Sequence, residues 1–214
     1  MHVHRHPRAT AGLQYRRCLA FSDPVHDARV CELRRPQPKA GAVDATLGKR
    51  DDKYCVRHHH IGGYHSDTKL FSRQEVEIVA LRDLVLAALN EYVPKFLEAN
   101  CYAPPTKLNL LIWGWGINMR AGDINFQHVH PDAKVSGVYY VSVPSPPQGS
   151  DEGAIMFADP RPRAHMNRVQ NQTTDITVIP KAGMMILFPA YYEHAVFPFR
   201  GAGVRTCIAF NAKF

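Results

Sequence analysis

The apolar positions of this chain change from a helical to a strand-like pattern near residue 105. In the first part, apolar side chains recur every three or four positions, at Ile78, Leu81, Val85, Leu89, Tyr92 and Phe96, which is the spacing of one helix face. Ser72-Arg73-Gln74-Glu75 just before them has the form of a capping box, and Pro94 should kink or interrupt the helix. The pattern predicts an amphipathic scaffold helix over about residues 73–98, with one face buried against a sheet.

Beyond residue 105, short runs rich in apolar and β-forming residues are separated by clusters of Gly, Pro, Asn and Asp. The predicted strands cover residues 107–113, 135–143, 154–157, 176–179, 184–189, 195–197 and 206–210. Gly114 and Gly116 should loosen the backbone after the first of them. About seven closely spaced strands after one long helix, with no repeat and no βαβ alternation, predict a mainly β fold, either a barrel or a two-sheet jelly roll.

The amino-terminal part of the chain differs in composition from the rest. Residues 1–17 contain three His and four Arg and no acid, which predicts a flexible basic arm, although such a start also fits an organellar transit peptide. Residues 18–21 and 30–33 predict a short strand pair or an edge segment broken by Pro24, and residues 34–57 predict a solvated loop. We therefore expect an arm over residues 1–17 and a single domain over residues 18–214.

Charge and composition exclude several classes of protein. The net charge is +7, but residues 1–57 hold 12 Arg and Lys against 6 Asp and Glu, so the remainder is nearly neutral. No basic stripe interleaved with aromatic residues is present, which argues against nucleic-acid binding. No apolar run approaches the ~18 residues of a membrane span. The five scattered cysteines form no Cys-x-x-Cys pair, so we expect a reducing, cytoplasmic compartment.

Three candidate metal ligands precede the predicted strand 135–143 at two-residue spacing. They are His128, His130 and Asp132. His130 and Asp132 with the distant His194 would supply the two histidines and one carboxylate of an oxygen-activating ferrous site. His128 and His130 with His194 would instead make a three-histidine site, which suits iron or zinc. The sequence leaves both sets open.

Arg205 follows His194 in the chain and lies on the last predicted strand. A buried guanidinium needs an anionic partner. An α-keto diacid would provide one, because its keto and C1 carboxylate oxygens could chelate the metal while its distal carboxylate pairs with Arg205. Tyr139 and Tyr140 alternate across their strand, so only one of them faces the barrel interior, where it could hydrogen-bond the diacid.

Other polar residues are weaker candidates. Three consecutive histidines at residues 58–60 point to alternate faces and cannot all reach one ion. We expect this segment to form a loop near the active site with His65 pointing inward. Asn109, Trp113, Asn125 and Asn211 are weaker candidates for the wall of the site.

Several motifs together resemble a family of 2-oxoglutarate and Fe(II)-dependent oxygenases, mostly from bacteria and phages. These motifs are His128-Val-His-Pro, then residues 136–141, 157–161, 180–183 and 188–189, then His194, and finally residues 205–211. Residues 62–66 also resemble the family, so the likeness covers about residues 18–214. Members of the family favour His-x-His-Pro at the first metal-binding pair.

This resemblance implies a double-stranded β-helix fold, ferrous iron, 2-oxoglutarate as cosubstrate and oxidation coupled to release of succinate and carbon dioxide. In the wider superfamily a His-x-Asp pair and a distal histidine bind iron, and a basic residue of the last strand binds 2-oxoglutarate; His194 and Arg205 match the last two roles. The alternatives are a cupin-like metalloenzyme with a three-histidine centre, or a binding module whose basic arm recruits an acidic partner. The substrate, whether small molecule or protein, and the oligomeric state stay open.

Overall fold

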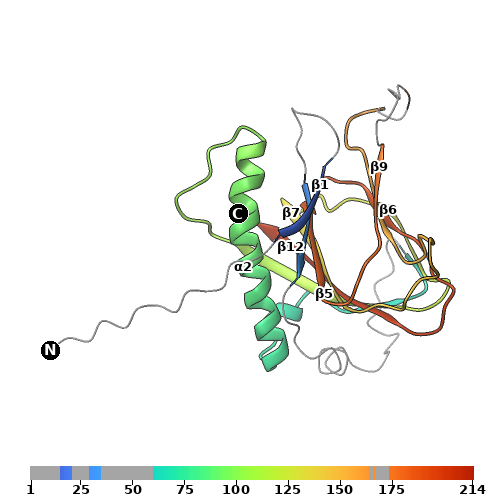
Figure 1. Ribbon diagram of the computed structural model, residues 1–214. Coiled ribbons are helices and arrows are strands. Elements are labelled where there is room, and N and C mark those ends of the chain that lie inside the picture. Colours follow the sequence, from blue (N-terminus) through green and yellow to red (C-terminus); the bar gives the residue numbers. More distant parts are fainter. Residues whose placement is uncertain (1–14, 21–28, 35–59, 164–165, 167–173) are drawn as a thin grey trace.

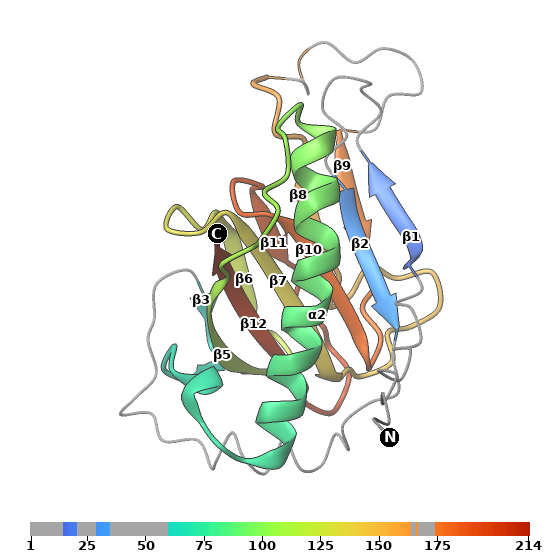
Figure 2. The ribbon, with the colours of Figure 1, turned by 90° about the vertical axis from the view of Figure 1, so that its left-hand side faces the viewer.

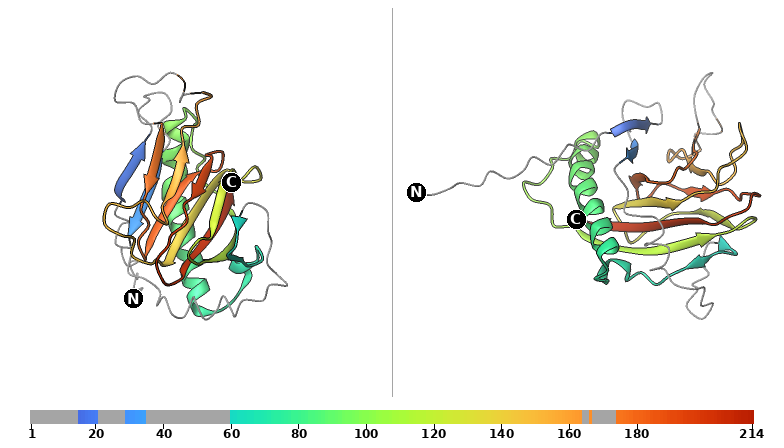
Figure 3. Two further views of the ribbon diagram at one scale, coloured as in Figure 1. Left: turned by 90° about the vertical axis from the view of Figure 1, so that its right-hand side faces the viewer. Right: turned by 60° about the horizontal axis from the view of Figure 1, so that its bottom comes forward.

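The computed structural model describes residues 15–20, 29–34, 60–163, 166 and 174–214. Residues 1–14 of the predicted arm and nearly all of the predicted loop 34–57 lie outside these residues, while residues 15–17 belong to a strand. The described part of the chain forms three layers, in which one long helix covers a large sheet and a smaller sheet faces its other side (Figures 1 and 3).

Within the residues that the structure describes, twelve strands form two antiparallel sheets. The larger sheet contains, in spatial order, β1 (Tyr15–Ala20), β2 (Arg29–Arg34), β10 (Met184–Pro189), β7 (Val135–Ser142), β12 (Arg205–Lys213), β5 (Leu111–Met119) and β4 (Tyr64–His65). The smaller sheet contains β3 (His60–Ile61), β6 (Ile124–His128), β11 (His194–Val196), β8 (Ile155–Ala158) and β9 (Asp175–Val178).

From β5 onward the chain passes back and forth between the two sheets. It runs from β5 to β6, back to β7, across to β8 and β9, back to β10, across to β11 and finally to β12. This alternation produces a double-stranded β-helix and confirms the predicted jelly roll. The short segment from β3 to β4 makes the same crossing and joins the sheets at one edge, where a loop was predicted. Of the three consecutive histidines, only His60 is among the described residues, as the first residue of β3.

The helix α2 (Val76–Ala99) packs on the outer face of the larger sheet (Figure 2). It begins later than predicted, at Val76, and Glu75 at its N-cap makes no side-chain capping bond, so the predicted capping box is wrong. A short 3₁₀ turn, η2 (Leu70–Ser72), buries its first two side chains in the core, and the chain is still extended at Arg73 before the helix starts. The helix continues through Pro94 without interruption. Within the described residues, no helix has the length and apolar character needed to cross a bilayer.

The strand predicted at residues 107–113 is displaced, because β5 starts at Leu111 and continues to Met119. Its glycines do not end the strand but allow close packing. A Cβ atom at Gly114 would lie 2.8 Å from the ring of Phe71 and 3.0 Å from the carbonyl oxygen of Ala209. The side chain of Phe71 therefore occupies the space that any other residue would fill.

Alternation along β7 sorts the core into two clusters. Tyr139 and Val141 join the cluster between the larger sheet and α2. Val138 and Tyr140 join the cluster between the two sheets. The inter-sheet cluster surrounds the cavity in which the predicted site residues meet.

Candidate functional site

A cavity of about 510 Å³ lies between the two sheets. That volume is typical of small-molecule sites. Its polar lining includes most of the predicted site residues, namely His65, Asn125, His128, His130, Asp132, His194, Arg205 and Asn211. His65 thus faces inward, as predicted.

Three histidines form a cluster at one part of the cavity wall. His128 ends β6 and is the direct cross-strand partner of His194, which begins β11. His130 follows in the next turn, where its backbone N–H donates to the carbonyl oxygen of Ala190 at 3.0 Å. The potential ligand atoms of the three histidines all lie within 4.8 Å of one another. The structure therefore brings together residues from distant parts of the chain in a group able to hold one metal ion.

Two of the imidazoles are oriented by backbone carbonyl groups. Nδ1 of His128 lies 2.6 Å from the carbonyl oxygen of Phe126, and Nδ1 of His194 lies 2.9 Å from that of Tyr192. A carbonyl oxygen only accepts hydrogen bonds, so each Nδ1 carries the proton and each Nε2 keeps its lone pair. Metal-binding histidines commonly have this arrangement, in which the second nitrogen fixes the tautomer and the ring orientation.

His194 is buried, and the phenyl rings of Phe157 and Phe188 pack around it with centroids 5.9 and 4.8 Å from the imidazole. Burial, followed by the neighbouring His128 imidazole, lowers the pKa of His194 to about 3. The ring is therefore neutral at physiological pH, which is the form that binds metal.

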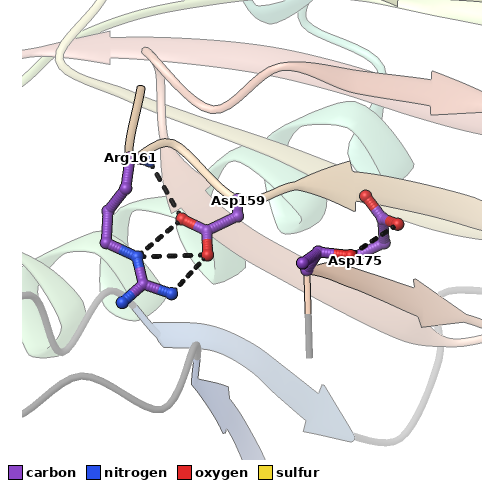
Figure 4. Close-up of polar contacts among 4 residues, drawn as sticks. Asp159, Arg161 and Asp175 are labelled. Carbon is purple, nitrogen blue, oxygen red and sulfur yellow. Dashed lines mark hydrogen bonds and ion pairs between the residues drawn. The ribbon is translucent and has the colours of Figure 1, made fainter. Parts of the chain in front are cut away.

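An ion pair braces the segment that follows Phe157 in the chain. Nε of Arg161 lies 3.0 and 3.1 Å from the two carboxylate oxygens of Asp159, and the backbone N–H of Arg161 also donates to that carboxylate at 2.9 Å (Figure 4). The backbone N–H of Asp159 donates to the carbonyl oxygen of Thr174 and so ties the end of β8 to the start of β9. This bracing holds in place the strand that supports His194.

Arg205 is almost completely buried, with 2% of its surface exposed. Its Nη1 donates to the carbonyl oxygen of Gly153 at 2.9 Å, and its Nη2 contacts the sulfur of Met119. Its Nε has no hydrogen-bond partner, and no carboxylate pairs with it among the described residues. A buried cation without a counterion is costly, so an anion bound in the cavity would stabilise the guanidinium.

Two more side chains line the cavity beside Arg205. Burial raises the pKa of Tyr140, and the Arg205 charge opposes this only in part, so the hydroxyl stays protonated. Burial likewise raises the pKa of Cys207 to about 11 and keeps it a thiol. Tyr139 lies in the helix-side core and does not line the cavity.

Asp132 lies in the turn after His130, at the cavity mouth. It lines the cavity, but its side chain is exposed and it lies outside the cluster of three histidine donors. Of the weaker candidates, Trp113, Asn125 and Asn211 line the cavity, whereas Asn109 does not.

Sequence reasoning missed Trp115, which lines the cavity with its ring centroid 5.9 Å from that of His130. It also missed Cys207. Each lies two positions from a named candidate on the same strand, Trp115 from Trp113 and Cys207 from Arg205. Because side chains two positions apart on a strand share a face, a step of two residues from each candidate would have found both.

Comparisons with known proteins agree with this geometry. Residues 114–211, less than half of the chain, match a family model described as "Putative 2OG-Fe(II) oxygenase". No curated protein matches the sequence. Among solved structures, a Pseudomonas putida prolyl-4-hydroxylase is 16% identical with a TM-score of 0.55, covering 84% of this chain and 88% of that one.

Two further solved structures are similar. HygX from Streptomyces hygroscopicus, with nickel and 2-oxoglutarate bound, is 14% identical with a TM-score of 0.53, covering 85% of this chain and 82% of that one. The carbocyclase SnoK from nogalamycin biosynthesis, described as non-heme and alpha-ketoglutarate-dependent, is 11% identical with a TM-score of 0.52, covering 86% and 78%. At these identities the likeness shows a shared fold.

Proposed function

We propose that the chain, whose residues 114–211 match a 2OG-Fe(II) oxygenase model, is a non-haem Fe(II)- and 2-oxoglutarate-dependent oxygenase with a metal centre of three histidines. Bound iron and 2-oxoglutarate would supply oxygen activation, with oxidation of a second substrate coupled to release of succinate and carbon dioxide. We further propose that residues 18–214 act as one domain, in a reducing, cytoplasmic compartment, on a small-molecule or protein substrate.

One observation carries this proposal. Three imidazoles whose donor atoms lie within 4.8 Å of one another share a single cavity with a buried arginine that lacks a counterion among the described residues. Neutral imidazoles suit a divalent transition metal, and the arginine suits a carboxylate. A metal-chelating dicarboxylate is the ligand class that satisfies both at once.

The metal ligands in this proposal are His128, His130 and His194. Hydrogen bonds from Nδ1 hold the rings of the first and last of these. Asp132 was the rival third ligand, and its exposed position at the mouth supports a role outside the metal centre. The charge of such a centre would come from the ion alone, since all three ligands are neutral.

Arg205 would bind the distal carboxylate of 2-oxoglutarate, with its Nε and remaining N–H groups as donors. Its position is fixed beforehand, because Gly153 and Met119 already hold the two terminal nitrogens. Tyr140, protonated and lining the same part of the cavity, can donate its hydroxyl hydrogen to that carboxylate. The buried apolar side chains of Ile155 and Val196 also line the cavity and would limit the access of water to the bound carboxylate.

The test is succinate formation by the Fe(II)-loaded protein. Anaerobically purified protein, given Fe(II), 2-oxoglutarate and then oxygen, should release succinate even without an added substrate, because 2-oxoglutarate can be oxidised alone. His194→Ala should abolish the reaction, whereas Glu193→Gln at the neighbouring exposed position should retain it.

A three-histidine centre also suits zinc or manganese, so a cupin-like metalloenzyme is the second candidate. Zinc-loaded protein serves as the comparison. Retained succinate release in purified His194→Ala would contradict the oxygenase proposal, as would tight zinc binding without any Fe(II)-dependent succinate release in the wild type.

A further inference from the structure

Asn211 is a buried polar residue of the cavity wall that has no role in the proposed function. The residue is 6% exposed and lines the cavity from β12. Its side-chain oxygen Oδ1 accepts a hydrogen bond from the hydroxyl of Ser136 at 2.8 Å. Its side-chain nitrogen Nδ2 makes no hydrogen bond within the described part of the chain. Because Ser136 already occupies the oxygen, the N–H donors of the amide are left for a ligand.

Strand register places Asn211 at the opposite end of the cavity from Arg205. The two residues are six positions apart on β12, so their side chains point to the same face of the strand. Arg205 pairs with Met119 on β5, whereas Asn211 pairs with Trp113. Six positions span about 20 Å along a strand. Asn211 is therefore too far along β12 to share the ligand group that Arg205 binds.

The histidine cluster lies between these two ends. The ring of Trp115 has its centroid 5.9 Å from that of His130. Trp115 pairs with Ala209, which lies two positions from Asn211 and four from Arg205. A molecule of 2-oxoglutarate held between the metal and Arg205 would leave the Asn211 end of the cavity open for the second substrate.

The walls of this open end suit a planar group without a negative charge. The half-buried indole rings of Trp113 and Trp115 line it, and aromatic rings stack on planar groups. Two exposed carboxylates, those of Asp67 and Asp132, also line the cavity, and they disfavour an anion beside them. The Lys213 ammonium lies 5.7 Å from the ring centroid of Trp113, but Lys213 does not line the cavity. An N–H donor in these surroundings suits a neutral carbonyl oxygen.

We propose that Asn211 positions the second substrate by donating a hydrogen bond from Nδ2 to a neutral carbonyl oxygen, and that the planar group carrying this oxygen packs against Trp113 and Trp115. The substrate class is thus a compound with a planar amide. Ser136 acts through Asn211, because its hydroxyl holds the amide with the nitrogen free to donate. This inference rests on the proposed function, since the metal and 2-oxoglutarate define which end of the cavity stays open.

Proton NMR of a small probe tests this role without turnover. Mn(II) in the histidine cluster broadens the signals of a probe bound close to it, whereas Zn(II) does not, so the difference between the two samples reports binding in the cavity. Saturating 2-oxoglutarate occupies the Arg205 end. The probes are benzamide, toluene, which keeps the ring but has no acceptor oxygen, and benzoate, whose acceptor oxygens are anionic.

Benzamide should bind the loaded wild type more tightly than benzoate does. Asn211→Leu should weaken benzamide about threefold to tenfold, the loss expected for one hydrogen bond, while toluene binding is unchanged. Ser136→Ala should weaken benzamide less, because it removes only the bond that orients the amide. The matched control is Asn118→Leu, since Asn118 lies on β5 but does not line the cavity. Binding of Mn(II) and 2-oxoglutarate should be unchanged in all three variants.

An equal loss of benzamide and toluene binding in Asn211→Leu would overturn the inference, as would unchanged benzamide binding. Displacement of benzamide by 2-oxoglutarate, or no binding of benzamide to the loaded wild type, would also overturn it. If Asn211→Leu does not fold, Asn211→Asp gives the answer, because its carboxylate keeps an acceptor for Ser136 and puts an oxygen in place of the donor. It should weaken benzamide at least about tenfold, and unchanged binding would again count against the inference. Failure of the wild type to bind Mn(II) and 2-oxoglutarate would instead refute the proposed function.

Discussion

Replacing Arg205 with methionine should stabilise the ligand-free protein and remove most of its response to 2-oxoglutarate. The guanidinium is 2% exposed, pairs with no carboxylate among the described residues and leaves Nε without a partner. Burying a charge in this way costs several kcal/mol, and the hydrogen bond to Gly153 returns about 1.5–3 kcal/mol. The ligand-free variant should therefore be more stable by about 1–3 kcal/mol, which raises the melting temperature by roughly 2–4 °C per kcal/mol.

Binding of 2-oxoglutarate, in contrast, should stabilise the Arg205→Met variant less than it stabilises the wild type. With Mn(II) present and 2-oxoglutarate at about 100 times the wild-type dissociation constant, the wild type gains about 2.7 kcal/mol. Loss of two charge-assisted hydrogen bonds, about 3 kcal/mol together, weakens binding by about a hundredfold. The variant then gains only about 0.4 kcal/mol at the same concentration.

Thermal denaturation followed by tryptophan fluorescence, with and without ligand, measures both effects. Arg200→Met is the matched control, because Arg200 is exposed and lies outside the cavity lining. A variant at Arg205 that kept the full 2-oxoglutarate shift would refute the carboxylate assignment. A ligand-free variant that melted well below the wild type would show that the guanidinium charge is already compensated.

Three further predictions concern the ligands, the packing and the pH response. His128→Ala should reduce metal affinity at least about tenfold while Asp132→Ala leaves it unchanged, as measured by metal titration, and the reverse result would favour the carboxylate set. Gly137→Ala should cost about 1–3 kcal/mol in chemical denaturation because its Cβ would overlap the ring of Phe210 and lie 2.8 Å from a methyl carbon of Leu187, whereas Gly201→Ala, with open space around it, should be neutral. The pKa of Cys207 rises on folding from 9 to about 11, so the stabilising contribution of this thiol is present below pH 9 and is lost as the pH rises to about 11. A Cys207→Ala variant should therefore lose less stability than the wild type between pH 9 and about 11, and an equal loss would refute this.

The pattern of the sequence predicted the architecture well where local periodicity and tertiary packing agree. The amphipathic helix and the antiparallel jelly roll are both present. The errors lie at element boundaries, where packing overrides local preference. Phe71 is buried in a 3₁₀ turn ahead of the helix, which starts only at Val76. The same side chain packs onto Gly114, and β5 continues through this glycine, which was expected to loosen the backbone.

The sequence by itself determined the residue types of the site. It supplied His128, His130 and His194 as potential ligands and Arg205 as a cation on the last strand, because these side chains carry their chemistry wherever the chain places them.

Only the tertiary structure decided which of these groups meet. Whether three imidazole nitrogens lie within 4.8 Å depends on the pairing of β6 with β11, which are far apart in the sequence. The pairing also carries a register shift, with His194 opposite His128 and Val196 opposite Asn125, and no local pattern encodes this shift because it depends on the register between distant strands. Likewise, the orientation of Tyr140 toward the cavity and of Tyr139 toward the helix follows from which face of β7 each layer covers.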